Sequence, residues 1–144
     1  MNNLKNLNVY LSNLAVLITK THNLHWNVVG LQFTTIHNYT EELYDYYFEK
    51  YDEVAEIIKM KGHYPLAKLS DYLANATVKE LDSKDLCTKE VMELIKVDME
   101  LLLADAKKIR EIANEEDDFA VANEMEDHIA HFTKQLWFIN SIMK

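Results

Sequence analysis

The stretch HNLHWNVVGLQFTTIH, residues 22–37, holds three of the six histidines of this chain, one of its two tryptophans and one of its two glycines. Helically spaced apolar residues run out near Gly30 and resume after it, which predicts a turn between two helices. His25 then lies at the end of the first helix and His37 near the start of the second. Two imidazoles therefore meet at one end of a helical hairpin, and imidazole suits iron, zinc and copper.

The rest of the chain has the same helical periodicity, and only two Gly and one Pro interrupt its 144 residues. This pattern predicts an all-α fold with four long helices in a single domain over residues 1–144. Residues 66–87 form a long connection, and residues 69–76 are expected to make a short helix inside it. Two short connections that flank a long one favour an up-down-down-up bundle, the ferritin-like layout.

Capping and breaking residues predict the helix boundaries. Gly62 and Pro65 are expected to end the second helix near residue 61. The expected N-caps are, in chain order, Thr34 or Thr35 for the second helix, Thr88 for the third, and Asp117 or Asp118 for the fourth.

The composition narrows the possible partners and the compartment. The formal net charge is −9 and no run of Lys or Arg occurs, so the surface repels phosphates and suits cations. The chain has no stretch of about 18 apolar residues, so no membrane-spanning helix is predicted. The chain does not open with a secretory signal, and its single cysteine, Cys87, fits a reducing environment. We therefore expect a cytoplasmic protein.

Two carboxylates further along the second helix extend the candidate site. Asp52 and Glu56 are spaced i, i+4, which places both on one helix face where they can hold one cation. Two imidazoles with two carboxylates make a suitable site for ferrous iron. However, His37 and Asp52 are 15 positions apart, roughly 22 Å at about 1.5 Å per residue. If these residues share a metal, a two-fold dimer must bring the histidine end of one helix to the carboxylates of its partner.

Each of these residues also has an ordinary explanation. A histidine near a helix end commonly caps the helix or packs in the core, and an Asp/Glu pair at i, i+4 is commonly a solvated face. The Glu-x-x-His motif of intrachain di-iron bundles occurs nowhere in the chain, which counts against the ordinary ferritin site.

The combination of residues, taken in order, resembles the Dps family of mini-ferritins without a gap from residue 22 to 56. The matching residues are His22, His25, Trp26, Gly30, Phe33, His37, Glu42, Leu43, Tyr44, Asp52, Ala55 and Glu56. Gly62, Pro65, Leu136 and Trp137 also fit, so the resemblance spans nearly the whole chain.

The resemblance implies a ferritin-like four-helix subunit with a short helix in its middle crossover, assembled as a hollow homo-dodecamer. It implies a ferroxidase centre at each two-fold interface, with His25 and His37 from one chain and Asp52 and Glu56 from the other as metal ligands. Fe(II) is oxidised there, preferably by hydrogen peroxide and otherwise by O2, and the ferric mineral is stored inside, which protects against oxidative stress. Zn is a possible substitute for iron in the site.

Several residues have open or unusual roles. Trp26 lies next to the ligand His25, and the resemblance suggests that its indole is oxidised so that no diffusible radical is released. Packing in the core is the ordinary explanation, and the two roles are compatible. His22 either orients its neighbours or simply packs. Ile57 stands where the family usually has Arg, so a salt bridge near the site is missing. His128-x-x-His131 is a second histidine pair, either a surface metal site or an ordinary half-buried face.

Three other hypotheses remain beside the ferroxidase. The same shell can trap iron or zinc without turnover, it can compact DNA, or the chain can be a helical interaction domain without metal. We do not expect DNA binding, because the family members that bind DNA often use a Lys/Arg-rich terminal tail. This chain has one Lys in its first ten residues and ends at Lys144 just after the last expected helix.

Overall fold

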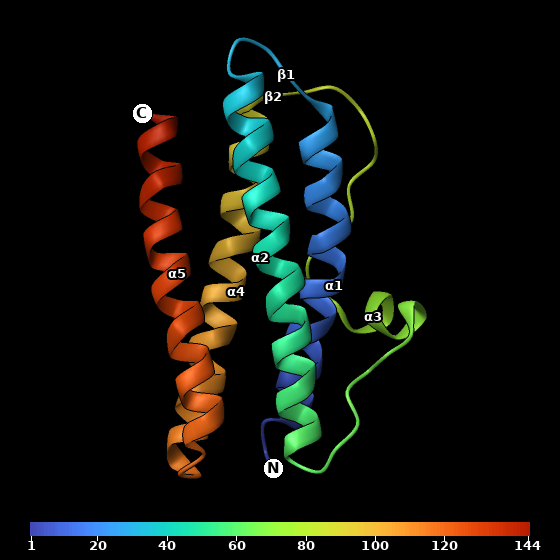
Figure 1. The fold of residues 1–144 in the computed structure, drawn as a ribbon, viewed down its shortest axis with the longest axis vertical. Helices are drawn as coiled ribbons and strands as arrows, with labels where there is room; N and C mark the ends of the chain where they lie inside the picture. The colour runs from blue at the N-terminus through green and yellow to red at the C-terminus, as the bar shows by residue number, and fades with distance from the viewer.

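The computed structural model describes residues 1–144 as a bundle of four long helices with a short helix in the middle crossover (Figure 1). The helices are α1 (Leu4–Asn27), α2 (Phe33–Met60), α3 (Leu69–Asn75), α4 (Thr88–Glu115) and α5 (Phe119–Met143). In Figure 1, α1 rises from the end that holds the N-terminus, α2 returns, the crossover climbs back, α4 descends and α5 rises again. The predicted up-down-down-up order and the short crossover helix are both confirmed.

The apolar stripes of the long helices meet in one core. Thirty buried residues form a single hydrophobic cluster that draws on every long helix and on the crossover. Tyr10, Tyr47 and Phe132 are the largest side chains buried within it. None of the helices combines the length and apolar composition that crossing a membrane requires.

Two short strands fasten the crossover to the α1–α2 turn. β1 (Val28–Val29) follows α1 directly, and β2 (Leu86–Cys87) directly precedes α4. They pair in parallel, with Val28 opposite Leu86. The sequence did not predict this pairing, because two residues are too few for a period-2 pattern to be recognised. The pairing holds the start of α4 beside the hairpin that carries His25 and His37.

The two glycines end or link helices as expected. Gly30 has φ +119° and Gly62 has φ +84°, which is the left-handed region that disfavours side chains. Gly62 therefore follows α2 in the conformation that commonly terminates a helix.

One of the three predicted caps is confirmed. Asp118 is the N-cap of α5, where its carboxylate accepts a hydrogen bond from the N–H of Val121. Thr88 is instead the first residue of α4, after Cys87 as N-cap.

The prediction that a threonine caps α2 is wrong. The N-cap is Gln32, and Thr34 and Thr35 lie inside the first turn. The helix starts early because the Phe33 N–H already donates to the Gly30 carbonyl, at 3.1 Å, within the turn itself. The threonines therefore come too late to act as caps.

Candidate metal centre

His25 and His37 face each other across the α1–α2 turn. Nδ1 of His25 lies 2.6 Å from the carbonyl oxygen of His37, and Nδ1 of His37 lies 2.7 Å from the carbonyl oxygen of His25. The two rings are stacked, with centroids 3.6 Å apart and planes 17° from parallel. The expectation that the hairpin brings these two imidazoles together is confirmed.

The hydrogen bonds define which ring nitrogen is free. A carbonyl oxygen only accepts, so each Nδ1 must carry the hydrogen and donate it. In the neutral ring, Nε2 then keeps its lone pair and is available to a metal. The Thr40 hydroxyl lies 3.2 Å from Nδ1 of His25 and donates to the Ile36 carbonyl, so its oxygen supports the same tautomer. Metal-binding histidines commonly donate their other ring N–H to a carbonyl or hydroxyl oxygen in this way, which fixes the ring orientation.

Aromatic side chains surround the pair. Phe33 stacks on His37 with centroids 5.0 Å apart, and the ring of Tyr44 stands edge-on to His25 at 5.2 Å. His22 stacks on Tyr44 at 3.7 Å and bonds through Nδ1 to a carbonyl of its own helix. His22 is therefore held by packing and does not hydrogen-bond to either of the paired histidines.

Trp26 follows His25 but points outward. Its side chain is 67% exposed in the single chain, and its ring centroid is 5.6 Å from that of His22. Packing in the subunit core, the ordinary explanation considered from the sequence, is therefore wrong. The exposed indole is free to meet another subunit or a reactive oxidant at this end of the hairpin.

Asp52 and Glu56 lie on the same helix as His37, and both are exposed. They share a face of α2, as their spacing predicts. Because α2 runs without a break, Asp52 lies about 22 Å and Glu56 about 28 Å along the helix from His37. One chain therefore does not bring all four residues together. Whether a second chain does so is a prediction to be tested.

A different cluster lies between α2 and α5. Glu53, Glu124 and His128 each offer one ligand atom, and these atoms lie within 4.8 Å of one another. Nε2 of His128 is 2.9 Å from Oε1 of Glu124, and Nδ1 of His128 is 2.7 Å from the hydroxyl of Tyr10. The surface metal site considered for His128 and His131 is wrong in its placement, since the side chain of His128 is completely buried.

No pattern in the sequence groups both Glu53 and Glu124 with His128. The i, i+4 spacing of Glu124 and His128 was a usable signal, but nothing local connects Glu53 with a residue 71 positions later.

The carboxylates of this cluster carry unequal charge. The hydrogen bond from His128 lowers the pKa of Glu124 to about 2. The hydrogen bond with Glu124, together with burial, raises the pKa of Glu53 to about 6. Lys50 donates to Oε2 of Glu53 at 3.0 Å and offsets part of the negative charge. The cluster thus concentrates anionic oxygen beside a buried imidazole.

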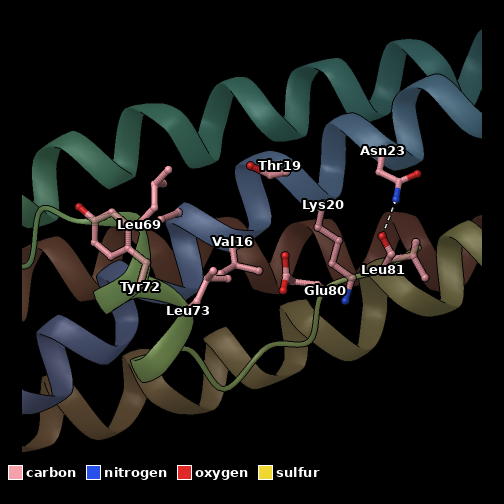
Figure 2. A pocket seen from close by; sticks show the side chains of 10 residues that line it. Val16, Thr19, Lys20, Asn23, Leu69, Tyr72, Leu73, Glu80 and Leu81 are labelled. Carbon is pink, nitrogen blue, oxygen red and sulfur yellow. Dashed lines mark hydrogen bonds between the residues drawn. The ribbon is translucent and has the colours of Figure 1, made fainter. Parts of the chain in front are cut away.

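A cavity of about 230 Å³ lies between α1 and the crossover, and no histidine lines it (Figure 2). Most of its lining is apolar, with Leu69, Tyr72 and Leu73 contributed by α3. The hydrogen bond from Asn23 to the Leu81 carbonyl, drawn in Figure 2, ties the crossover to α1 at one end. No set of ligating or nucleophilic side chains converges there, so we assign no chemistry to it.

Comparison with known proteins identifies close relatives of this architecture. Residues 4–144 match the model of a family described as "Ferritin-like domain". The chain is 32% identical over 126 residues to a "DNA protection during starvation protein" of Helicobacter pylori, covering 88% of each chain.

Solved structures agree with this result. The Dps protein of Vibrio cholerae O1, described as a member of a broad superfamily of ferritin-like diiron-carboxylate proteins, superposes with a TM-score of 0.94 at 30% identity, covering 99% of this chain and 90% of the other. The Dps of Listeria innocua, from a crystal soaked with zinc, gives a TM-score of 0.93 at 30% identity, covering 98% and 95%.

Proposed function

This chain belongs to the Dps family of ferritin-like proteins, and on that basis we propose that it oxidises ferrous iron and stores the ferric product. The observation that carries the proposal is the pairing of His25 with His37. Both rings are fixed by reciprocal backbone hydrogen bonds with Nε2 left free. Two preorganised neutral nitrogen ligands suit a borderline metal such as Fe(II).

We assign the remaining ligands to a second copy of the chain. Asp52 and Glu56 are exposed on α2 and available to a partner. An antiparallel two-fold dimer would bring the carboxylates of one α2 to the histidines of the other, and its symmetry would create two such sites. We propose that these dimers build a hollow dodecamer, with one iron site for each chain.

The chemistry requires an oxidant that accepts two electrons. Two Fe(II) ions each lose one electron to hydrogen peroxide, the O–O bond breaks, and two hydroxides result; the ferric ions then hydrolyse and mineralise. O2 is the alternative oxidant. The carboxylates stabilise the ferric charge, and the few protein ligands leave coordination positions open to the oxidant. Trp26 is exposed next to His25. Its indole would give up an electron to a reactive oxidant formed at the site, so that no diffusible radical is released.

The expected benefit to the cell is the removal of iron and peroxide together, which protects against oxidative damage. We place this activity in the cytoplasm, where the exposed single cysteine, Cys87, would remain reduced.

The test compares metal-free wild type with Asp52→Asn and with Asp45→Asn, a control at another exposed aspartate of α2. Each protein, first checked for shell-sized elution, receives Fe(II) anaerobically and then hydrogen peroxide, while the ferric absorbance is followed. We expect fast oxidation in wild type and Asp45→Asn, slow oxidation in Asp52→Asn, and ferric product that elutes with the shell. Equal oxidation rates in all three proteins, no faster than the oxidation of Fe(II) in buffer, would exclude a ferroxidase activity.

A shell that traps metal without turnover is the second candidate. Imidazole and carboxylate ligands also suit Zn²⁺, and the zinc-soaked Listeria innocua Dps makes zinc a natural competitor to examine. Oxidation of many equivalents of Fe(II) by a small amount of protein distinguishes the ferroxidase from the trap, because a trap stops at its binding capacity.

DNA compaction is the third candidate, and the net charge of −9 argues against it. Phosphate binding draws its affinity from cations that release condensed counterions. We expect no shift of plasmid DNA in a gel at physiological salt, and a salt-resistant shift would restore this candidate.

A further inference from the structure

The cluster of Glu53, Glu124 and His128 takes no part in the proposed iron site and shares no residue with it. It lies within one chain, between the last third of α2 and the first half of α5. Its three ligand atoms lie within 4.8 Å of one another. His128 is fully buried, and the side chain of Glu124 is 17% exposed. A small ion would reach the cluster from the side of Glu53, whose side chain is 35% exposed.

The donor atoms match a transition-metal site. One imidazole nitrogen and two carboxylate oxygens bind Zn²⁺ or Fe²⁺ at about 2.0–2.2 Å, so neighbouring ligand atoms stand about 3–4 Å apart. The observed 2.9 Å between His128 Nε2 and Glu124 Oε1 is close to that separation already. Since all three ligand atoms already lie within 4.8 Å of one another, small side-chain movements would bring the third ligand to the cation.

We propose that Glu53, Glu124 and His128 form a second, intrachain site for one divalent transition-metal cation. The ligand set leaves positions open for water and differs from the Glu-x-x-His arrangement of intrachain di-iron bundles, which this sequence lacks. The cation would bridge α2 to α5, and it would do so in every chain regardless of how the chains assemble.

Two tyrosines support the site. The hydroxyl of Tyr10 lies 2.7 Å from Nδ1 of His128, so it can accept a hydrogen bond from Nδ1 while Nε2 binds the cation. The hydroxyl of Tyr46 is buried without a hydrogen-bond partner. The Tyr46 ring lies 6.3 Å from that of His128, centroid to centroid. Burial, followed by the negative charges of Glu124 and Glu53, raises the pKa of Tyr46. Water on a bound cation would provide the missing partner.

Lys50 acts as the counter-charge when the metal is absent. Its ammonium group lies 3.0 Å from Oε2 of Glu53 and 3.7 Å from Oε1 of Glu49, whose side chain is 65% exposed. A cation that binds Glu53 would displace Lys50 toward Glu49. Lys50 and the metal therefore compete for one carboxylate, and removal of the lysine should strengthen metal binding.

The test uses the assembled protein in an Asp52→Asn/Glu56→Gln background, which removes the carboxylates of the proposed interface site. The metal-stripped protein is titrated with Co²⁺, whose visible absorption reports its ligands. We expect about one Co²⁺ per chain. Glu124→Gln should weaken this binding by at least roughly tenfold, and Lys50→Met should strengthen it by about tenfold. Glu126→Gln, two residues from both Glu124 and His128 and in an exposed pair with Arg110, is the control and should change nothing.

A crystal of the cobalt-loaded protein provides the second measurement. An anomalous peak between Glu53, Glu124 and His128 supports the site, and a peak elsewhere or none contradicts it. If Glu124→Gln does not assemble, the anomalous map and the Lys50→Met titration decide the question. Opposite effects of the two variants exclude a merely structural cluster. Because the background lacks the interface carboxylates, failure of this site and failure of the ferroxidase proposal remain separate results.

Discussion

His25 and His37 each hydrogen-bond through Nδ1 to the backbone carbonyl of the other, at 2.6 and 2.7 Å, across the turn that joins α1 to α2. The orientation of each ring is thus set by the backbone that carries its partner. Because Gly30 makes this turn with φ +119°, the backbone geometry and the ligand geometry depend on each other. A change in either histidine therefore disturbs both nitrogen ligands.

The hydroxyl of Thr40 lies 3.2 Å from Nδ1 of His25 and is completely buried. Thr40→Val keeps the side-chain volume and leaves Nδ1 only the carbonyl of His37. We expect peroxide-driven Fe(II) oxidation to slow by about tenfold, the usual effect of losing a group that orients a metal-binding histidine, while the shell still assembles. Thr35→Val, at an exposed position in the same helix, is the control. An unchanged rate in Thr40→Val would show that the carbonyl alone orients the ring.

Mixed shells test whether the iron site lies between chains. We propose to combine His37→Ala chains with Asp52→Asn chains, each inactive alone. In an antiparallel dimer of one chain of each kind, one site has two damaged halves and the other has two intact halves. Random mixing should therefore restore about a quarter of the wild-type oxidation rate per chain.

If the iron site lay within one chain, mixing would restore no oxidation activity, because every chain has one ligand substituted. Mixing two batches of the same variant controls for effects of the mixing procedure itself. A rate that stays at the level of either variant would contradict the assignment of Asp52 and Glu56 to the partner.

Much of this fold was predictable because it follows from periodicity. Stripes at helical spacing predicted all four long helices and the short α3, and glycines predicted the ends of the hairpin. The start of α2 was mispredicted, because the hydrogen bond from Phe33 to Gly30 begins the helix before the threonines. The β1–β2 pairing was not predicted, since its partners Val28 and Leu86 are joined only in three dimensions.

The candidate sites divide in the same way. His25 and His37 were predictable as neighbours because one short turn separates their helices. Their tautomers were not, because these depend on carbonyl positions that no side-chain pattern records. Glu53 joins Glu124 and His128 only after α2 packs against α5. Contacts between distant elements leave no periodic signal in one sequence.

His131 makes the protein sensitive to acid. Burial, followed by repulsion from His128, Lys50 and Lys134, lowers the pKa of His131 to about 4, from an ordinary value of 6.5. Between pH 6.5 and pH 4, the unfolded chain binds a proton at this site and the folded chain does not. This contribution to stability is therefore fully present above pH 6.5 and is lost as the pH falls toward 4.

In the wild type, the ring of His131 stacks on that of Tyr46 with centroids 3.6 Å apart. The matched variant is His131→Phe, which keeps an aromatic ring at this position. Urea unfolding at one subunit concentration should show a smaller loss of stability from pH 7 to pH 5 in the variant than in wild type. Parallel losses in the two proteins would assign the acid sensitivity to other groups.

The ion pair between Lys20 and Asp98 provides the last prediction. It links α1 to α4 at 2.7 Å, with the two side chains only 6% and 9% exposed. Burial raises the pKa of Asp98, and the bond from Lys20 opposes that rise. Lys20→Met leaves the carboxylate buried without its partner, which should lower the free energy of unfolding by about 3–5 kcal/mol.

The double variant Lys20→Met/Asp98→Leu should recover most of that loss, because it removes both buried charges and keeps the packing volume. Lys89→Met breaks an exposed pair with Glu93, 4.0 Å apart, and should change stability by less than about 0.5 kcal/mol. Urea unfolding of the four proteins measures these differences. If the double variant is as unstable as Lys20→Met, the loss comes from packing of the lysine stem and not from the unpaired charge.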